Sequence, residues 1–444
     1  MDYPDFYKPC IPRNLLLQRK GEHCLLIDPE RPNWILSSAL GALILACCNG
    51  QTSVADLTRI VVEAQRISYE EARNTVAQLI RRVEEASFVA DTREVRETDD
   101  QRNYLLVDLN LTNDCNLRCL YCYADAEGPL ESEMSTDEVI HLLDRLVVLS
   151  PTVIAFTGGE PLLRKDLFEI APYATEIGLP TSLVTNGILI DERNAEQLAE
   201  YFDKVQVSLD SNTASIRERL RGRNTFDETV SALRLLVEAE ANAAVGAALT
   251  SLNLADLPNI ARLILEMDVN SFHITRFTAW GRGAEHPDLL PDVDKCIWVA
   301  DTLDEQFAGE IELDLFGFSR PARLYKELSC GIGKRYISIR ANGDVYPCYG
   351  IHAPEFCAGN IRTHDIVDVY RESTVFKRCR ELTVDAIETC KGCPWRYLCG
   401  HGCRALALLA NGALNSQPTT YECDFQRKMI ERSLWEPVRS RFKG

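Results

Sequence analysis

The stretch LTNDCNLRCLYCY, residues 111–123, places Cys115, Cys119 and Cys122 in one short loop directly after a predicted strand, Tyr104–Thr112. Three thiolates on one tight loop can hold three irons of a cubane cluster and leave the fourth iron without a protein ligand. A three-ligand zinc site or buried cysteines are the alternatives. A loop at the carboxyl end of a strand is where functional residues gather in parallel α/β folds, so we expect a cluster.

The residues that follow alternate between strand and helix patterns. The first helix begins with a capping box formed by Ser135 and Glu138. Six strands are predicted, at Tyr104–Thr112, Val153–Thr157, Thr181–Thr185, Lys204–Leu209, Ala243–Thr250 and Phe272–Phe277. This alternation predicts an α/β fold with a parallel sheet and outer helices, as an open doubly wound sheet or a partial barrel.

Composition limits the compartment and the partners. The chain has 444 residues, 46% of them hydrophobic, which is enough for about three domains. No apolar run is long enough to span a membrane, and the first residues do not resemble a secretory signal. A net charge of −18 argues against nucleic acid as a partner. With 17 cysteines and no export signal, we expect a cytoplasmic protein whose clustered cysteines bind metal.

Residues 1–92 predict a winged-helix-like unit. Strands are expected at 15–19, 23–28 and 33–37, and helices at 38–48, 54–65 and 69–84. A capping box, Ser68 and Glu71, opens the last helix. Ten basic residues against twelve acidic ones make DNA binding by this unit a poor hypothesis. The charged stretch 91–103 is predicted to be a linker.

Seven cysteines near the carboxyl end form a second pattern. Cys330 is followed by twelve residues, Gly343, four residues and Cys348. The others are spaced two, five, three and nineteen residues apart, as Cys390, Cys393, Cys399, Cys403 and Cys423. Such spacing suits either a zinc ribbon or an iron–sulfur site, because both need tetrahedral thiolate ligands.

Together these motifs resemble the radical S-adenosylmethionine (SAM) superfamily. Its three-cysteine loop follows the first strand and has an aromatic residue, here Tyr121, before the last cysteine. Its GGEP motif follows the second strand, here as Gly158, Gly159, Glu160 and Pro161. The resemblance implies a partial (β/α)6 barrel at 104–290, a bridging region at 291–329 and a cysteine-rich SPASM domain at 330–427, after the N-terminal winged-helix-like domain.

The resemblance also implies SAM as a cofactor, beside the first 4Fe-4S cluster. Glu160 would take its ammonium group and Arg221 its carboxylate. The residues implied in cofactor binding are Tyr121, Gly158, Gly159, Glu160, Asn186, Ser208, Asp210 and Arg221. A turn at Asn186, a helix cap at Asp210 and a solvated Arg221 are the structural alternatives.

In the SPASM pattern the seven cysteines hold two auxiliary 4Fe-4S clusters. The resemblance assigns Cys330, Cys348 and Cys403 to the nearer cluster. It assigns Cys390, Cys393, Cys399 and Cys423 to the farther one. Cys357 is the local candidate for the missing fourth ligand of the nearer cluster. Without it, that iron is open and could bind a substrate thiolate.

Residues 1–92 resemble the leader-recognition domain of ribosomal peptide maturases. The third strand, near 34–36, would pair with a leader peptide by β-augmentation. We therefore expect a maturase that abstracts hydrogen with a 5′-deoxyadenosyl radical and crosslinks a precursor peptide, with a thioether favoured. Reduced ferredoxin or flavodoxin would supply electrons, and no catalytic acid or base is identified. The alternatives are a tetrapyrrole-type small-molecule oxidoreductase and, less favoured, an iron–sulfur redox-sensing regulator.

Overall fold

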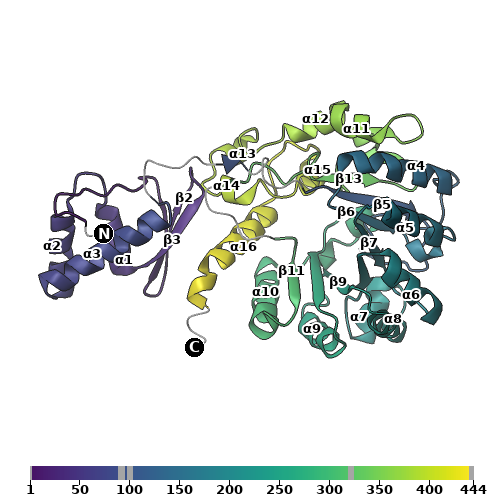
Figure 1. Cartoon of the computed structure of the whole chain (residues 1–444), viewed down its shortest axis with the longest axis horizontal. Helices are drawn as coiled ribbons and strands as arrows, with labels where there is room; N and C mark the ends of the chain where they lie inside the picture. The colour runs from purple at the N-terminus through teal and green to yellow at the C-terminus, as the bar shows by residue number, and fades with distance from the viewer. Residues whose placement is uncertain (1–2, 89–95, 98–103, 319–324, 440–444) are drawn as a thin grey trace.

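The computed structural model describes residues 3–88, 96–97, 104–318 and 325–439 (Figure 1). Its N-terminal unit has three antiparallel strands in the order β1-β2-β3, followed by three helices. They are β1 (Leu16–Lys20), β2 (His23–Asp28), β3 (Asn33–Ser38), α1 (Ala39–Cys47), α2 (Val54–Gln65) and α3 (Tyr69–Glu85). The predicted capping box is confirmed, because the Ser68 side chain accepts from the Glu71 amide and the Glu71 side chain accepts from the Ser68 amide.

The central sheet has its strands in sequence order. They are β5 (Leu106–Thr112), β6 (Val153–Gly158), β7 (Thr181–Thr185), β8 (Lys204–Ser208), β9 (Ala243–Leu249), β10 (Ser271–Arg276) and β11 (Glu312–Leu315). Each pairs in parallel with the next. A doubly wound sheet reverses its strand order at a switch point, whereas this order runs one way, as in a barrel. The structure therefore favours the partial barrel over the doubly wound sheet.

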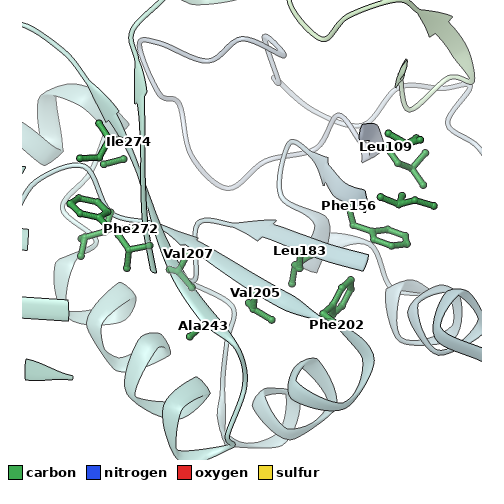
Figure 2. Packing of buried hydrophobic residues seen from close by; sticks show 14 of the residues in the cluster. Leu109, Phe156, Leu183, Phe202, Val205, Val207, Ala243, Phe272 and Ile274 are labelled. Carbon is green, nitrogen blue, oxygen red and sulfur yellow. The ribbon is translucent and has the colours of Figure 1, made fainter. Parts of the chain in front are cut away.

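Helices cover the outer face of this sheet. They are α4 (Thr136–Leu146), α5 (Leu167–Glu176), α6 (Glu192–Tyr201), α7 (Ala214–Arg221), α8 (Phe226–Glu238), α9 (Leu257–Glu266) and α10 (Val293–Phe307). Alternate strand residues such as Leu109, Phe156 and Val205 are fully buried in this core (Figure 2). Because side chains alternate across a strand, their neighbours face the inside of the barrel. The region 291–329, expected to bridge, contributes α10 and a seventh parallel strand, β11.

The cysteine-rich part continues the same sheet. β13 (Tyr336–Ile339) pairs in parallel with β5, and β14 (Asp344–Tyr346) and β15 (Gly359–Asn360) follow antiparallel. The helices are α11 (Ile366–Glu372), α12 (Thr374–Arg380), α13 (Glu388–Lys391), α14 (Arg396–Cys399), α15 (Arg404–Asn411) and α16 (Thr420–Arg439). The predicted linker lies outside the described residues except for β4 (Arg96–Glu97), which pairs with β12 (Tyr325–Lys326).

The N-terminal sheet is covered on both faces. Cys24, Leu26 and Ile35 pack with the apolar residues of α1–α3. The opposite face packs against α14 and α16, and Figure 1 shows α16 passing beside β2 and β3. Trp34 and Trp435 meet there in one buried cluster, and the Trp435 indole N–H donates to Gln18 Oε1 at 3.3 Å. The N-terminal unit is thus fastened to the cysteine-rich part. No helix among the described residues is long and apolar enough to cross a membrane.

This contact yields a stability prediction. Replacing Trp435, which is 2% exposed, with Ala should cost about 3–5 kcal/mol in the unfolding free energy of the N-terminal unit and α16. Trp298→Ala is the matched control, because Trp298 is 50% exposed and its loss should cost no more than about 0.5 kcal/mol. Denaturant unfolding followed by fluorescence measures both, and equal costs for the two variants would contradict the described packing.

Candidate functional site

The three-cysteine loop is fixed by backbone contacts from two neighbouring segments. The Leu120 amide donates to Leu220 O at 2.9 Å, at the end of α7. The Arg282 side chain donates to Cys119 O at 2.9 Å and its amide to Cys122 O at 3.1 Å. Burial raises the pKa of Cys119 to about 12, so the free thiol is protonated at neutral pH. Metal binding there would replace that proton, as thiolate ligation requires.

The two glycines after β6 let that strand end approach the loop closely. A Cβ on Gly159 would lie 2.0 Å from Asp114 O, and Gly158 has a φ of +126°, which other residues rarely adopt. The Gly159 amide donates to Thr112 O at 2.8 Å and the Glu160 amide to Asp114 O at 2.7 Å. These bonds join the GGEP motif to the backbone that carries Cys115.

Glu160 ties the ends of β6 and β7 together. Its carboxylate is 1% exposed and accepts from Thr185 Oγ1 at 2.7 Å and from the Asn186 amide at 2.8 Å. Burial raises its pKa, and these donors oppose the rise. One oxygen has a single donor, which leaves lone-pair capacity for a ligand's ammonium group.

Asp210, Arg221 and Tyr121 form a buried network. Arg221 donates through Nε to Asp210 Oδ2 at 2.6 Å, and the Tyr121 hydroxyl donates to the same oxygen. Despite burial, the charge of Asp210 raises the pKa of Arg221, whose charge also acts on Cys119. Arg221 is therefore a fixed cation beside the loop. The solvated alternative does not apply, because Arg221 is 5% exposed.

Asn186 and Ser208 occupy the ends of β7 and β8. The Asn186 side chain donates to Asn116 Oδ1 at 2.7 Å and accepts from the Ile188 amide at 3.0 Å. It thus forms the predicted turn and also holds the cysteine loop. Ser208 is partly exposed at the strand end. Contact of either residue with a cofactor stays a prediction.

The structure groups the distal cysteines into two sets. The nearer set, Cys330, Cys348 and Cys403, packs around one apolar cluster. The farther set is Cys390, Cys393, Cys399 and Cys423. Burial raises the pKa of Cys399 to about 12, with smaller contributions from Glu422 and the other three cysteines. This grouping is the one that the resemblance to the SPASM pattern implies, while metal ligation itself remains a prediction.

A buried cation lies between the two sets. Arg404 is fully buried and donates to the carbonyls of Leu414, Ser416 and His401, not to a carboxylate. Its charge opposes the burial-driven rise in pKa at both Cys330 and Cys390. A buried charge needs an opposite charge nearby, and thiolate-bound clusters would supply it. The residues therefore fit iron–sulfur clusters.

A second observation supports the fit at the nearer set. The indole N–H of Trp280, packed against the same apolar cluster, is buried without a hydrogen-bond partner among the described residues. Hydrogen bonds to cluster sulfurs are common and tune their potentials. In the part of the chain that is described, no three Cys, His, Asp or Glu side chains converge as ligands of a single ion. A cubane does not need such convergence, because each thiolate binds a different iron.

Cys357 is not among the cysteines that pack around the apolar cluster of the nearer set. Its thiol donates to Gly359 O at 3.4 Å, and its charge acts on Tyr346. Its role as fourth ligand of the nearer cluster stays a prediction that these contacts do not support.

The sequence analysis missed a polar and aromatic network inside the barrel. Tyr123 and Tyr349 meet edge to face with centroids 6.0 Å apart, and Trp280 packs on Tyr349 at 5.9 Å. Each tyrosine directly follows a motif cysteine, Cys122 or Cys348, which is a signal that could have found them. Asp108, Ser338 and His352 form the adjoining polar chain. No motif marks these three residues.

His352 gives this network a pH dependence. Burial lowers its pKa to about 3, so only the unfolded chain gains its proton as the pH falls below the usual value of about 6.5. Stability should therefore fall by about 2 kcal/mol between about pH 7.5 and about pH 5 from this group alone. His352→Gln should remove this part of the loss in denaturant unfolding. His364→Gln, at an exposed position, is the control, and equal slopes for the wild type and H352Q would contradict the prediction.

Comparison with known proteins agrees with this geometry. Residues 109–264 match the radical SAM superfamily, and residues 330–394 match SPASM, an iron–sulfur cluster-binding domain. The PqqA peptide cyclase of Bradyrhizobium diazoefficiens is 29% identical over 71% of this chain and 85% of its own length. The mycofactocin maturase MftC of Mycolicibacterium smegmatis is 31% identical over 66% of this chain and 76% of its own.

A further relative is named for heme synthesis and not for the modification of a peptide. The AdoMet-dependent heme synthase of Methanosarcina barkeri is 26% identical over 69% of this chain and 93% of its own. The solved structure of Streptococcus suis SuiB bound to S-adenosylmethionine has a similar fold, with a TM-score of 0.61 at 15% identity over 93% of this chain and 99% of its own. The chain belongs to the radical SAM superfamily and is an enzyme that carries a SPASM iron–sulfur cluster-binding domain.

Proposed function

We propose that this enzyme modifies a ribosomally made precursor peptide and forms an intramolecular crosslink in it, with a thioether favoured. The observation that carries the proposal is the edge of the N-terminal sheet. β3 pairs with β2 on one side and with no other described strand on its other side. An edge strand of this kind can accept a peptide as an added strand.

The edge lies next to polar side chains of α3. The Leu36 carbonyl accepts from the Arg82 guanidinium at 2.9 Å, and the Asn33 side chain donates to Ala86 O at 2.8 Å. A leader strand would take the place of Arg82 at that carbonyl. Its side chains would then lie between β3 and α3, where sequence preference could arise.

The bound cofactors, a reduced 4Fe-4S cluster and SAM, supply the one-electron chemistry that removes hydrogen from an unactivated carbon. The chain would hold the cluster through Cys115, Cys119 and Cys122. Glu160 and Arg221 would hold the ammonium and carboxylate groups of SAM. Reduced ferredoxin or flavodoxin is the electron donor that we expect.

The type of crosslink depends on whether the cluster of the nearer set has an open iron. A net oxidative crosslink removes two hydrogens from the peptide and needs an electron acceptor, for which the auxiliary clusters are suited. Because the Cys357 thiol donates a hydrogen bond to Gly359 O, we favour a nearer cluster with an open iron, which could bind a substrate thiolate. That arrangement suits a thioether rather than a carbon–carbon or carbon–oxygen bond.

A small-molecule substrate is the second candidate, supported by the heme synthase relative. It would not need an edge strand on a separate N-terminal unit. Peptide dependence therefore separates the two candidates.

The test is crosslinking of a captured peptide. Peptides retained by the full chain from a native anaerobic lysate are incubated with reconstituted, reduced enzyme and SAM. We expect mass spectrometry to show the loss of two hydrogens and of one free thiol. Cys119→Ala should still bind the peptide but form neither 5′-deoxyadenosine nor product. Cofactor cleavage by the wild type without any peptide change would instead favour the small molecule, and a retained thiol would exclude the thioether.

Leader docking is tested by a proline on each edge of the N-terminal sheet. Leu36→Pro removes one N–H of β3 and should weaken peptide binding at least about tenfold, because main-chain bonds supply the affinity. Leu17→Pro, on the opposite edge strand β1, is the control and should bind as the wild type does. Fluorescence titration measures both, with circular dichroism to check folding. Equal affinities would place the leader elsewhere.

A further inference from the structure

Asp108 is a buried carboxylate that faces the inside of the barrel. Its neighbours in β5, Val107 and Leu109, are fully buried in the helix-facing core. Because side chains alternate along a strand, Asp108 points to the opposite face, where it is 5% exposed. A charged group in that position is costly unless it is paired or has a function.

The four groups that donate to Asp108 are all neutral. Thr157 Oγ1 donates at 2.9 Å and Tyr123 Oη at 3.3 Å to one oxygen. Ser338 Oγ donates at 2.7 Å and Asn110 Nδ2 at 3.0 Å to the other. These bonds fix the orientation of the carboxyl group but bring no positive charge to it. Burial therefore dominates and raises its pKa.

The other two buried carboxylates of the site, Asp210 and Glu160, have partners that suit them to other roles. Asp210 is ion-paired with Arg221 at 2.6 Å. Glu160 accepts two backbone amides and a hydroxyl across the ends of β6 and β7. Glu160 also has a raised pKa and neutral hydrogen-bond donors, but the charge of Arg221 acts on it and it lies where it would hold the ammonium group of SAM. Of these three carboxylates, Asp108 is the one that is neither ion-paired nor assigned to cofactor binding.

A hydrogen-bonded chain leads away from Asp108. Ser338 has one hydroxyl proton, which it donates to Asp108, so its oxygen accepts from His352 Nε2 at 2.9 Å. The lowered pKa of His352 keeps its ring neutral at pH 7, so it brings no positive charge to this chain. Both hydrogen bonds point toward Asp108, so the chain holds its carboxylate in the form that can accept a proton.

The position of Asp108 relative to the two cofactor regions completes the argument. Tyr123, which donates to it, directly follows Cys122, and the ring of Tyr123 meets that of Tyr349, which directly follows Cys348. The carboxylate thus lies in the barrel between the three-cysteine loop and the nearer set. A substrate held between those regions would be next to it.

We infer that Asp108 is the base that accepts the proton which the substrate loses when the crosslink forms. The inference rests on the proposed function. The substrate thiol gives up one proton as it becomes a thiolate, and after one hydrogen atom has been removed from carbon, closing the carbon–sulfur bond releases one electron. The proton goes to the Asp108 carboxylate. The electron goes to an oxidised iron–sulfur cluster of the auxiliary cysteines, which is the one-electron oxidant.

The test separates proton acceptance from cofactor cleavage. Asp108→Asn keeps the shape of the side chain but removes its basicity. Crosslinked product should fall about 100-fold or more while 5′-deoxyadenosine still forms, so the ratio of 5′-deoxyadenosine to product rises by a similar factor. Asp144→Asn is the matched control, because it makes the same change at an exposed carboxylate of α4 that accepts from Tyr173. Its ratio should stay near that of the wild type.

A second readout does not depend on turnover. Infrared spectra of the holoenzyme, recorded against pH without peptide or SAM, should contain a protonated carboxyl band that D144N keeps and D108N lacks. The titratable groups that interact with Asp108 include Tyr123, Cys348, Tyr349 and, through Ser338, His352, and none of them contributes a carboxyl band. The band therefore identifies the group.

The outcomes are distinct. An unchanged ratio in D108N, or the absence of a carboxyl band that D108N removes, would overturn the role of Asp108. An equal fall of cofactor cleavage and product would show a structural role and would also overturn it. If the wild type modifies no peptide at all, the proposed function fails, and the role of Asp108 fails with it.

Discussion

The parallel pairing of β13 with β5 is the constraint on which the rest of the structure depends. Four residue pairs, from Tyr336 with Leu106 to Ile339 with Leu109, join the cysteine-rich part to the strand that carries the three-cysteine loop. The register of two paired strands cannot shift gradually, because a shift of one residue turns every side chain of the strand to the other face of the sheet. The loop after β5 and Cys348 after β14 are therefore held in one fixed relation. The polar chain from Asp108 to Ser338 crosses this same ladder.

A second tie fixes the farther set from the other side of the barrel. Arg276, at the end of β10, is ion-paired with Glu422 at 2.6 Å, and both side chains are buried. Glu422 also accepts from the Cys403 amide at 3.2 Å and precedes Cys423 in α16. The same helix packs against the N-terminal sheet. A peptide bound at β3 would thus be connected to the farther set through the packing of α14 and α16 on the N-terminal sheet.

The sequence predicted what local patterns can encode. Strand periodicity located β5–β10 to within about two residues, and cysteine spacing located the two cysteine-rich motifs, whereas the division of the distal cysteines into two sets came from the resemblance to the SPASM pattern. It did not predict β11 or the pairing of β13, since parallel pairing joins segments that are far apart in the chain. Asp108 was equally hidden, because its alternation with Asn110 and Thr112 shows only that one face of β5 is polar and not which side chain on it has a function. Arg282 and Asn116, which hold the cysteine loop, act through contacts that only the fold creates.

Arg404 and Asp108 are both buried charged groups without ionic partners, and they differ in the charge that would compensate them. Arg404 donates only to carbonyls and lies between cysteine sets that would become anionic on binding metal. Asp108 accepts only from neutral groups and lies where the substrate would lose a proton. A buried charge with no permanent counter-ion is costly in both places. At Arg404 the compensating charge would come from clusters that stay bound, whereas at Asp108 it would come from a proton that must leave again after each turnover. The neutral donors around Asp108, Ser338 among them, hold its carboxylate ready to accept that proton, while Arg404 is surrounded by fixed carbonyls.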